Sequence, residues 1–432
     1  MRKVLLLICC VLLVACQGQQ EKSQVTNQTT NQGDLILKEW KYLSNMGDGN
    51  DDGYYRLVNH EDGVTNILYT DYSTGQEVYL CNKPECQHKD ESCTSYVESE
   101  DIEDIFVYGD HLYLIENAPT NMITFSDEGM SYSDAQEGPS IYQMDLDGQN
   151  KKELYQLEDG YNFEASNMVL DGDDLYLSVI KNDNVEVAEN SQLQVQTSNE
   201  LYKVNLKNGE AKKILDLYEG QSDCQISEVD GRKIILSGYY CQEDPQKYLD
   251  KKDYDGYDKA LMDSEPLYEV YDIDSGQKQT YQLKDESGEY YQGQLYFIKN
   301  NILYAYGLES QKSQEILTLP KGYTYSTDLL NHRLIINQWK GETFQKTYYV
   351  SLDKPSLKEL KQYKSAPKEP VTILVQGNNQ LFVVYDREGQ EEKTWAGTMQ
   401  YEVKKEYRGL ISIDDFLDGK NNYQKVSMIE DK

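Results

Sequence analysis

Three cysteines and one histidine lie close together in a short segment, which reads CNKPECQHKDESC from Cys81 to Cys93. Thiolates and imidazole suit a tetrahedral Zn²⁺, and the three cysteines with His88 form an accepted ligand set. The spacing C-x4-C-x-H-x4-C differs from that of common zinc fingers. The alternatives are one disulfide with a spare thiol, or unpaired structural cysteines. In each case Cys81, Cys86, His88 and Cys93 are expected to staple a long surface connection.

Two further cysteines flank a predicted strand–turn–strand unit. Cys224 opens its first strand and Cys241 follows its second, with a turn at Asp230-Gly231 between them. The turn would place the two residues nearly opposite one another, with Cα atoms about 5.5 Å apart, as a disulfide requires. We therefore expect a disulfide between Cys224 and Cys241.

A weaker pattern of oxygen ligands occurs near the start of the chain. Asp48, Asn50 and Asp52, followed by glycine, match the first half of a calcium loop of the type D-x-N-x-D-G. Position twelve is Asn59 rather than the bidentate glutamate that such a loop needs. A solvated turn is the better interpretation, and a weak Ca²⁺ site is the alternative.

The N-terminus has the features of an export signal. Met1, Arg2 and Lys3 precede an apolar run that is shorter than the roughly 20 residues of a membrane-spanning helix. The sequence from Leu13 to Cys16 (LVAC) resembles the lipobox of bacterial lipoprotein precursors. The resemblance implies that residues 1–15 are removed, that Cys16 is lipidated, and that the mature protein lies outside the cytoplasm on the cell membrane.

The segment that follows Cys16 is polar and contains no aromatic residue. It cannot bury enough apolar surface to fold. Residues 16–34 are therefore expected to be the lipidated cysteine and a disordered tether, and residues 35–432 the folded domain.

The folded part repeats a unit in which an alternating strand, a turn rich in Gly, Asp, Asn or Ser, and a second strand follow one another. This is the pattern of a β-hairpin. The clearest copies occur at 141–157, 201–217, 267–283 and 303–319, and weaker copies at 67–80, 347–360 and 407–429. Further hairpins precede most of the copies, at 167–180, 226–239, 327–337 and 371–385. Two hairpins per repeat give a four-stranded antiparallel sheet.

Repeated four-stranded sheets resemble the blades of a β-propeller. The pattern is similar to surface-lipoprotein propellers of Gram-positive bacteria and, more distantly, to TolB-like propellers. We expect an all-β fold with seven blades, with six or eight blades as alternatives. A pair of β-sandwiches is disfavoured, because the repeat continues through the middle of the chain without a linker.

Successive strands of a blade run in opposite directions, so the connections alternate between the two ends of the blades. We call the end with the second-to-third-strand connections and the blade-to-blade connections the top face, and the other end the lower face. Four long insertions join second to third strands, at 118–140, 181–199, 241–266 and 386–406, and the Cys/His segment joins two blades. All five belong to the top face, which we expect to be the interaction surface.

The net charge limits the classes of molecule that the protein can bind. The net charge of −33 repels phosphate backbones, so nucleic acid is excluded as a partner. The 38 tyrosines, against 7 phenylalanines, suit half-buried strand positions. We expect a binding or scaffold protein for a protein, peptide or glycan ligand, rather than an enzyme. The alternative is an extracytoplasmic carbohydrate-active hydrolase or lyase.

Overall fold

The structure is a computed structural model. It describes residues 33–40, 46–60, 64–98, 101–117, 124–126, 129–131, 138–188, 191–284, 287–393 and 399–429. The expected signal peptide, Cys16 and nearly all of the expected tether lie outside the described residues. Among the helices that the structure describes, none is long and apolar enough to span a membrane.

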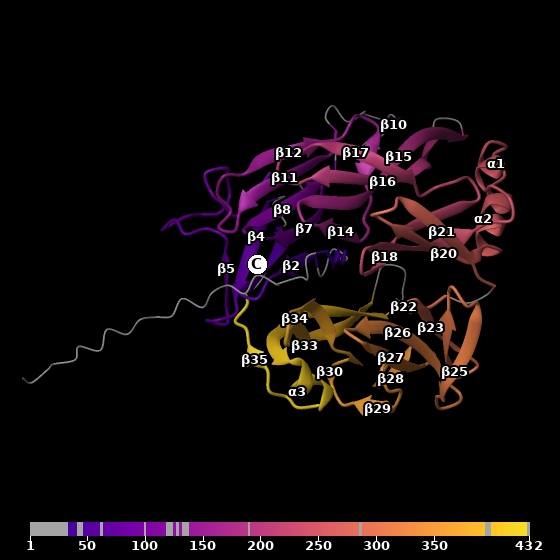
Figure 1. Ribbon diagram of the computed structural model, residues 1–432. Coiled ribbons are helices and arrows are strands. Elements are labelled where there is room, and N and C mark those ends of the chain that lie inside the picture. The colour runs from indigo at the N-terminus through magenta and orange to yellow at the C-terminus, as the bar shows by residue number, and fades with distance from the viewer. Residues whose placement is uncertain are drawn as a thin grey trace, which may run out of the picture. The chain divides into compact units, whose positions relative to one another are not determined.

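Seven antiparallel sheets, each built on four strands in chain order, confirm the predicted seven-bladed β-propeller (Figure 1); β6 (Tyr96–Val97) adds a strand to the sheet of blade 1, and β1 (Ile36–Lys38) and β13 (Tyr161–Phe163) add strands to that of blade 3. Blade 1 contains β2 (Gly47–Gly49), β3 (Gly53–Asn59), β4 (Thr65–Asp71) and β5 (Gln76–Tyr79). Blade 2 contains β7 (Ile102–Tyr108), β8 (His111–Glu116), β11 (Ser140–Asp145) and β12 (Lys152–Gln156). Blade 3 contains β14 (Met168–Asp171), β15 (Asp174–Ala188), β16 (Ser191–Asn205) and β17 (Ala211–Asp216). Blade 4 contains β18 (Ser222–Asp230), β19 (Lys233–Tyr240), β20 (Glu265–Asp272) and β21 (Gln277–Gln282).

The last three blades follow the same order. Blade 5 contains β22 (Glu289–Tyr291), β23 (Gln294–Lys299), β24 (Ile302–Gly307) and β25 (Lys312–Thr318). Blade 6 contains β26 (Thr324–Leu330), β27 (Arg333–Lys340), β28 (Thr343–Ser351) and β29 (Leu357–Leu360). Blade 7 contains β32 (Thr372–Gln376), β33 (Gln380–Lys393), β34 (Met399–Ser412) and β35 (Gln424–Lys425), with α3 (Ile413–Leu417) before its last strand. Two short hairpins lie outside the blades, β9 (Thr124–Ser126) with β10 (Gly129–Ser131), and β30 (Tyr363–Ser365) with β31 (Lys368–Pro370).

The turns between third and fourth strands form for local reasons. In blade 1 the Asp71 carboxylate accepts hydrogen bonds from the backbone N–H groups of Ser73 and Thr74, which closes the turn. Gly75 then adopts a positive φ of 65°, a conformation that costs glycine little. Asp272 and Gly276 repeat this arrangement in blade 4.

The core of the propeller lies between neighbouring blades. Six apolar clusters join successive blades, and a seventh joins blade 7 to blade 1. In this seventh cluster the ring of Phe382 lies 5.0 Å from that of Tyr54 and 5.4 Å from that of Tyr72. Aromatic packing therefore closes the ring of blades.

The C-terminal segment adds a second closure, at the outer strand of blade 1. Ser427 forms a parallel bridge with Gln76, and the Ile429 N–H donates to the Glu77 carboxylate. The same carboxylate accepts two hydrogen bonds from Arg56, at 2.7 and 2.9 Å, and its side chain is fully buried. Residues Ser427 and Ile429 thus attach the C-terminal segment to blade 1.

Strand β1 (Ile36–Lys38) was not predicted. It does not join blade 1, which follows it in sequence, but pairs antiparallel with β14, so that Leu37 lies opposite Val169 of blade 3. Arg232 holds the residues before β1, since its guanidinium donates to the Gly33 carbonyl and to Asp171. The first described residues therefore pair with β14, the first strand of blade 3.

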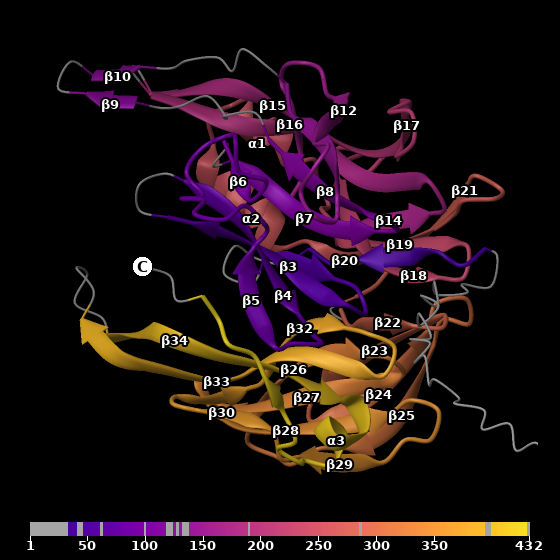
Figure 2. The same ribbon diagram turned by 90° about the vertical axis from the view of Figure 1, so that its left-hand side faces the viewer.

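The insertions lie between second and third strands, as predicted, but two of them are not loops. Residues 181–199 and 386–406 are occupied mainly by continuations of β15, β16, β33 and β34, which extend two blades into long hairpins (Figure 2). Residues 241–266 contain two helices, α1 (Gln246–Leu249) and α2 (Tyr254–Met262). The top face therefore carries ordered secondary structure as well as loops.

Candidate metal centre

Both ends of the Cys/His segment are held by the same strand. Strand β5, which precedes Cys81, places Tyr79 opposite Leu68 of β4. Strand β6 (Tyr96–Val97), which follows Cys93, returns to β4 and places Tyr96 opposite Asn66. Because the two anchor points lie two residues apart on one strand, the segment must form a compact loop at the top face.

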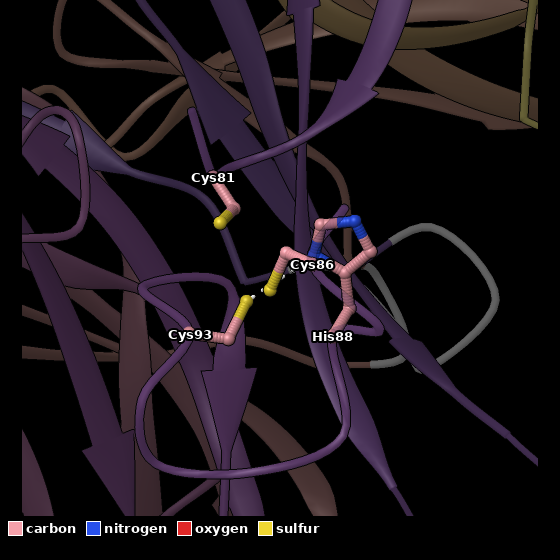
Figure 3. A group of neighbouring side chains, drawn as sticks. All are labelled: Cys81, Cys86, His88 and Cys93. Carbon is pink, nitrogen blue, oxygen red and sulfur yellow. Dashed lines mark hydrogen bonds between the residues drawn. The ribbon is translucent and has the colours of Figure 1, made fainter. Parts of the chain in front are cut away.

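The loop brings the four predicted ligands together (Figure 3). One ligand atom from each of Cys81, Cys86, His88 and Cys93 lies within 4.8 Å of all the others, and His88 Nδ1 is 3.2 Å from Cys93 Sγ. A tetrahedral ion with metal–sulfur bonds of about 2.3 Å would place its ligand atoms about 3.8 Å apart. A contraction of at most about 1 Å would complete the coordination shell, so the group could hold a metal ion.

The loop backbone is shaped for this convergence. Glu85 and His88 adopt left-handed conformations, with φ of 60° and 58°, which are uncommon for residues other than glycine. The Lys83 ammonium donates to the Ser92 carbonyl, which joins the two sides of the loop. Such strained conformations are typical of ligand clamps, where binding offsets their cost.

Two residues around the ligands were not predicted from the sequence. The ring of Tyr79 stacks on the His88 imidazole, with centroids 4.1 Å apart and planes inclined by 10°. The buried Asn66 side chain donates to the His88 carbonyl at 3.0 Å. The position of Tyr79, directly before the cysteine segment, is the only local signal for its role. Asn66 lies on another strand, and nothing in its neighbourhood in the sequence indicates this contact.

The protonation preferences of three ligands are set by the loop. Burial raises the pKa of Cys81, but hydrogen bonds from the Lys83 N–H and from neighbouring thiols outweigh this effect, so that its pKa is lowered. Burial lowers the pKa of His88 and so favours the neutral imidazole that binds metals. Burial raises the pKa of Cys93 to about 12, and this thiol would have to release its proton to a bound metal.

The composition of the ligand set indicates a structural role. Four protein ligands fill a tetrahedral shell and leave no position for water or substrate. All three cysteines are free thiols in the structure. A metal ion bound here would fix a top-face connection rather than catalyse a reaction.

The calcium candidates have other contacts. The Asp48 carboxylate accepts from Lys38 Nζ at 2.6 Å and from the Val107 N–H at 2.9 Å. The Asn50 side chain accepts from the N–H groups of Asp52 and Gly53 and so closes its own turn. These contacts agree with a solvated turn between β2 and β3.

The disulfide predicted between Cys224 and Cys241 is not formed, and both thiols are free and buried. Cys224 lies opposite Gly238, while the Cys241 N–H donates to the Gln221 carbonyl. The two cysteines are thus three positions apart along the ladder, or about 10 Å at 3.3 Å per residue, beyond disulfide reach. A bulge between Ile226 and Glu228 contributes one position of this displacement.

No protein-family model matches the chain, and no curated protein matches it. Similar solved structures include a puromycin-hydrolysing peptidase of Mycobacterium tuberculosis, 12% identical with a TM-score of 0.49; the alignment covers 93% of this chain and 55% of the peptidase. An oligogalacturonate lyase in complex with manganese is 12% identical, with a TM-score of 0.38 and coverage of 76% and 78%. TolB from Acinetobacter baumannii is 12% identical, with a TM-score of 0.32 and coverage of 83% and 76%. These likenesses concern the propeller fold alone.

Proposed function

We propose that this protein is a lipid-anchored, extracytoplasmic binding or scaffold propeller that meets its partner through the top face. The observation that carries the proposal is the uneven distribution of insertions between the two ends of the blades. The helices α1 and α2, the long hairpins of blades 3 and 7, and the Cys/His loop all belong to top-face connections. The lower face has short turns such as those at Gly109 and Gly231, apart from the connection of blade 7 that contains α3. Insertions on a rigid scaffold commonly carry binding function.

The proposed anchor is a lipid on Cys16. The lipobox resemblance at Leu13–Cys16 and the short apolar run before it support this part of the proposal. Several acyl chains, at about 0.8 kcal/mol per buried CH₂, hold a protein stably on a membrane. A flexible segment of the length of residues 17–34 would let the propeller sit roughly 20–25 Å from the anchor.

The proposed ion of the Cys/His loop is zinc. Thiolate and imidazole ligands in a closed set of four are typical of structural zinc sites. Its role would be to fix the loop between blades 1 and 2, so that the top face presents one conformation to a partner. Binding to a fixed loop avoids the entropy cost of ordering it.

The proposed partner is a protein, a peptide or a glycan. The net charge of −33 favours neutral or basic ligands and disfavours nucleic acid. Surface tyrosines suit contacts with all three classes, because the ring packs while the hydroxyl forms hydrogen bonds.

The anchor can be tested by cell fractionation. Cys16→Ser should move the protein from the membrane fraction to the soluble extracytoplasmic fraction and abolish incorporation of labelled fatty acid. Cys9→Ser, which alters a cysteine inside the expected signal peptide, is the matched control and should change neither property. Retention of the Cys16→Ser protein on the membrane would refute the lipid anchor.

The binding face can be tested with a photo-crosslinking amino acid placed at one exposed position on each end. Met262, in α2, is 84% exposed on the top face, and Asp110 is exposed on the lower face. The proposal predicts discrete adducts in intact cells from position 262 and none from position 110. Adducts from position 110 alone would show that the partner binds the lower face, and would refute the proposal.

One observation favours the alternative function, a carbohydrate-active hydrolase or lyase. Burial raises the pKa of Glu164 to about 7, and the pKa of neighbouring Asp223 is also raised by burial. A carboxyl group partly protonated at neutral pH, near a second carboxyl group, is the pairing that glycoside hydrolysis uses. Release of reducing ends from a polysaccharide by the wild type, but not by Glu164→Gln, would establish this alternative.

A further inference from the structure

A cavity of about 350 Å³ lies at the top face, between the strands of blade 4 and the helices inserted into that blade. Asp223 of β18 and Tyr239 of β19 line it from the sheet, and Tyr254 and Tyr257 line it from α2. Tyr218, in the connection from blade 3, also lines the cavity. Figure 1 shows α1 and α2 beside the strands of blade 4. The volume lies near the lower end of the range for small-molecule sites, about 300–1,000 Å³.

Two carboxylates line the cavity: Asp223 comes from a strand of blade 4, and Asp258 comes from α2. Asp223 lies directly opposite Tyr239 in the ladder, and it accepts from Asn199 Nδ2 at 2.8 Å and from Gln196 Nε2 at 3.4 Å. Within the part of the chain that the structure describes, no lysine, arginine or histidine forms an ion pair with Asp223. The cavity lining itself contains no basic residue. Burial raises the pKa of Asp223, which shows that its charge is poorly solvated.

A further carboxyl group, that of Glu164, lies near Asp223. Glu164 is close enough to Asp223 for their charges to interact, and its Oε2 atom is buried without a hydrogen-bond partner. The hydroxyl of Tyr254, in the cavity wall, is also buried without a partner. Unsatisfied buried polar atoms are uncommon in folded proteins, and a bound ligand is one way in which they become satisfied.

The cavity wall suits an organic cation. Four tyrosines, at positions 218, 239, 254 and 257, line a space of this size, and aromatic rings attract ammonium groups electrostatically. An anionic ligand would be repelled by Asp223. A metal ion fits poorly, since the Cys/His loop is the only group of three or more metal-binding side chains found close together among the described residues.

We propose that this cavity binds an alkylammonium group, carried by a free amine or by the lysine side chain of a peptide. Asp223 neutralises the charge, and the tyrosines surround the methylene groups next to it. The proposal rests on the proposed function, because it names the ligand class of one top-face site. It adds that recognition is by positive charge and not by shape alone.

The first experiment uses the wild-type protein, purified in detergent, and isothermal titration calorimetry with two probes of equal size, pentylamine and pentan-1-ol. The amine should bind at least about tenfold more tightly than the alcohol, since a charged hydrogen bond to a buried carboxylate exceeds about 1.4 kcal/mol. Equal affinity, or no heat of binding from either probe, would overturn the proposal. Cadaverine and Nα-acetyl-lysine methylamide then distinguish the two sources, and whichever binds more tightly identifies the natural carrier.

Two variants locate the site. Asp223→Asn should weaken amine binding at least about tenfold and leave alcohol binding unchanged. Tyr257→Leu should weaken amine binding by about two- to thirtyfold, the range expected for a lost cation–ring contact. Asp110→Asn, which removes an exposed carboxylate from the lower face, is the matched control and should bind as the wild type. Wild-type amine affinity in a folded Asp223→Asn protein would refute the assignment.

The failure of this inference can be told apart from the failure of the proposed function. If pentylamine does not bind while position 262 still forms crosslinks in cells, the top face remains the binding surface and only the ligand class is wrong. If both results are negative, the proposed function fails as well.

Discussion

Replacing Phe382 by alanine should open the contact that closes the ring of blades. Its side chain is 1% exposed and packs against Tyr54 and Tyr72, which belong to the other end of the chain. Truncation of a buried phenylalanine to alanine costs about 3–5 kcal/mol. The unfolding entropy of about 2.1 cal/mol/K per residue gives about 0.8 kcal/mol/K for a domain of roughly 400 residues. The expected decrease in Tm is therefore about 4–6 °C.

The assay is thermal unfolding followed by circular dichroism, combined with hydrogen exchange. Phe297→Ala is the matched control, because it removes the same atoms from a buried ring in blade 5, where Phe297 stacks on Tyr304. Both variants should lose stability. Only Phe382→Ala should accelerate amide exchange in β3 and β33 together, because these strands lie on the two sides of the closure.

Two results would contradict the predicted role of Phe382. A loss of less than about 1 kcal/mol in Phe382→Ala would show that the last blade contributes little to the fold. If Phe297→Ala accelerated amide exchange in blades 1 and 7 as much as Phe382→Ala does, the packing of Phe382 would not be what holds these two blades together. Tyr323→Ala, at a position that is 38% exposed, should change stability by no more than about 0.5 kcal/mol.

Three further predictions concern buried charge and the metal centre. Glu77→Gln breaks the buried ion pair with Arg56 and should lower the free energy of unfolding, measured in urea, by about 3–5 kcal/mol. The double replacement of Arg56 and Glu77 by leucine should recover most of this loss. Equal losses in the two proteins would contradict the pairing. Burial raises the pKa of Asp104 to about 8, above the value of about 3.9 in an unfolded chain. The stabilising contribution of Asp104 is therefore full below about pH 4 and is lost as the pH rises towards 8. Asp104→Asn should have a higher Tm than the wild type at pH 9 but not at pH 4. The same pH dependence of Tm in both proteins would contradict this. A free metal concentration of 100 times the Kd adds about 2.7 kcal/mol to the free energy of unfolding. EDTA should therefore lower the Tm of the wild type by about 3 °C and leave that of His88→Asn unchanged. An equal shift in both proteins would exclude His88 as a ligand.

The sequence predicted the blades because each hairpin carries its own signal. Alternating apolar residues and turns such as Asp272–Gly276 act within a few residues, so that the pattern can be recognised locally. The Cys/His loop was predictable for the same reason, since its four ligands are close in sequence. The compactness of that loop could not be foreseen, because it depends on the return of β6 to β4.

Features that depend on distant pairing were missed. Strand β1 pairs with β14, more than a hundred residues away, and its sequence carries no turn or repeat that would announce this. The extended hairpins of β15–β16 and β33–β34 contain only short alternating runs, VEVA at 185–188, LQVQ at 193–196 and QYEVK at 400–404, within otherwise polar insertions, and these runs were not recognised as strands. The expected disulfide failed because the register set by the hairpin turn already separates Cys224 and Cys241 by two positions, and the bulge in β18 adds a third. The tyrosine cavity escaped notice because its residues come from three strands, two helices and a connection between blades.

The most direct test of the proposed zinc centre is metal analysis of the purified protein, by native mass spectrometry together with a free-thiol count. We predict one zinc ion per chain, and loss of this ion in Cys86→Ser but not in Cys241→Ser, whose thiol lies outside the Cys/His loop. A protein without metal, in which two of Cys81, Cys86 and Cys93 form a disulfide, would contradict the proposed zinc centre.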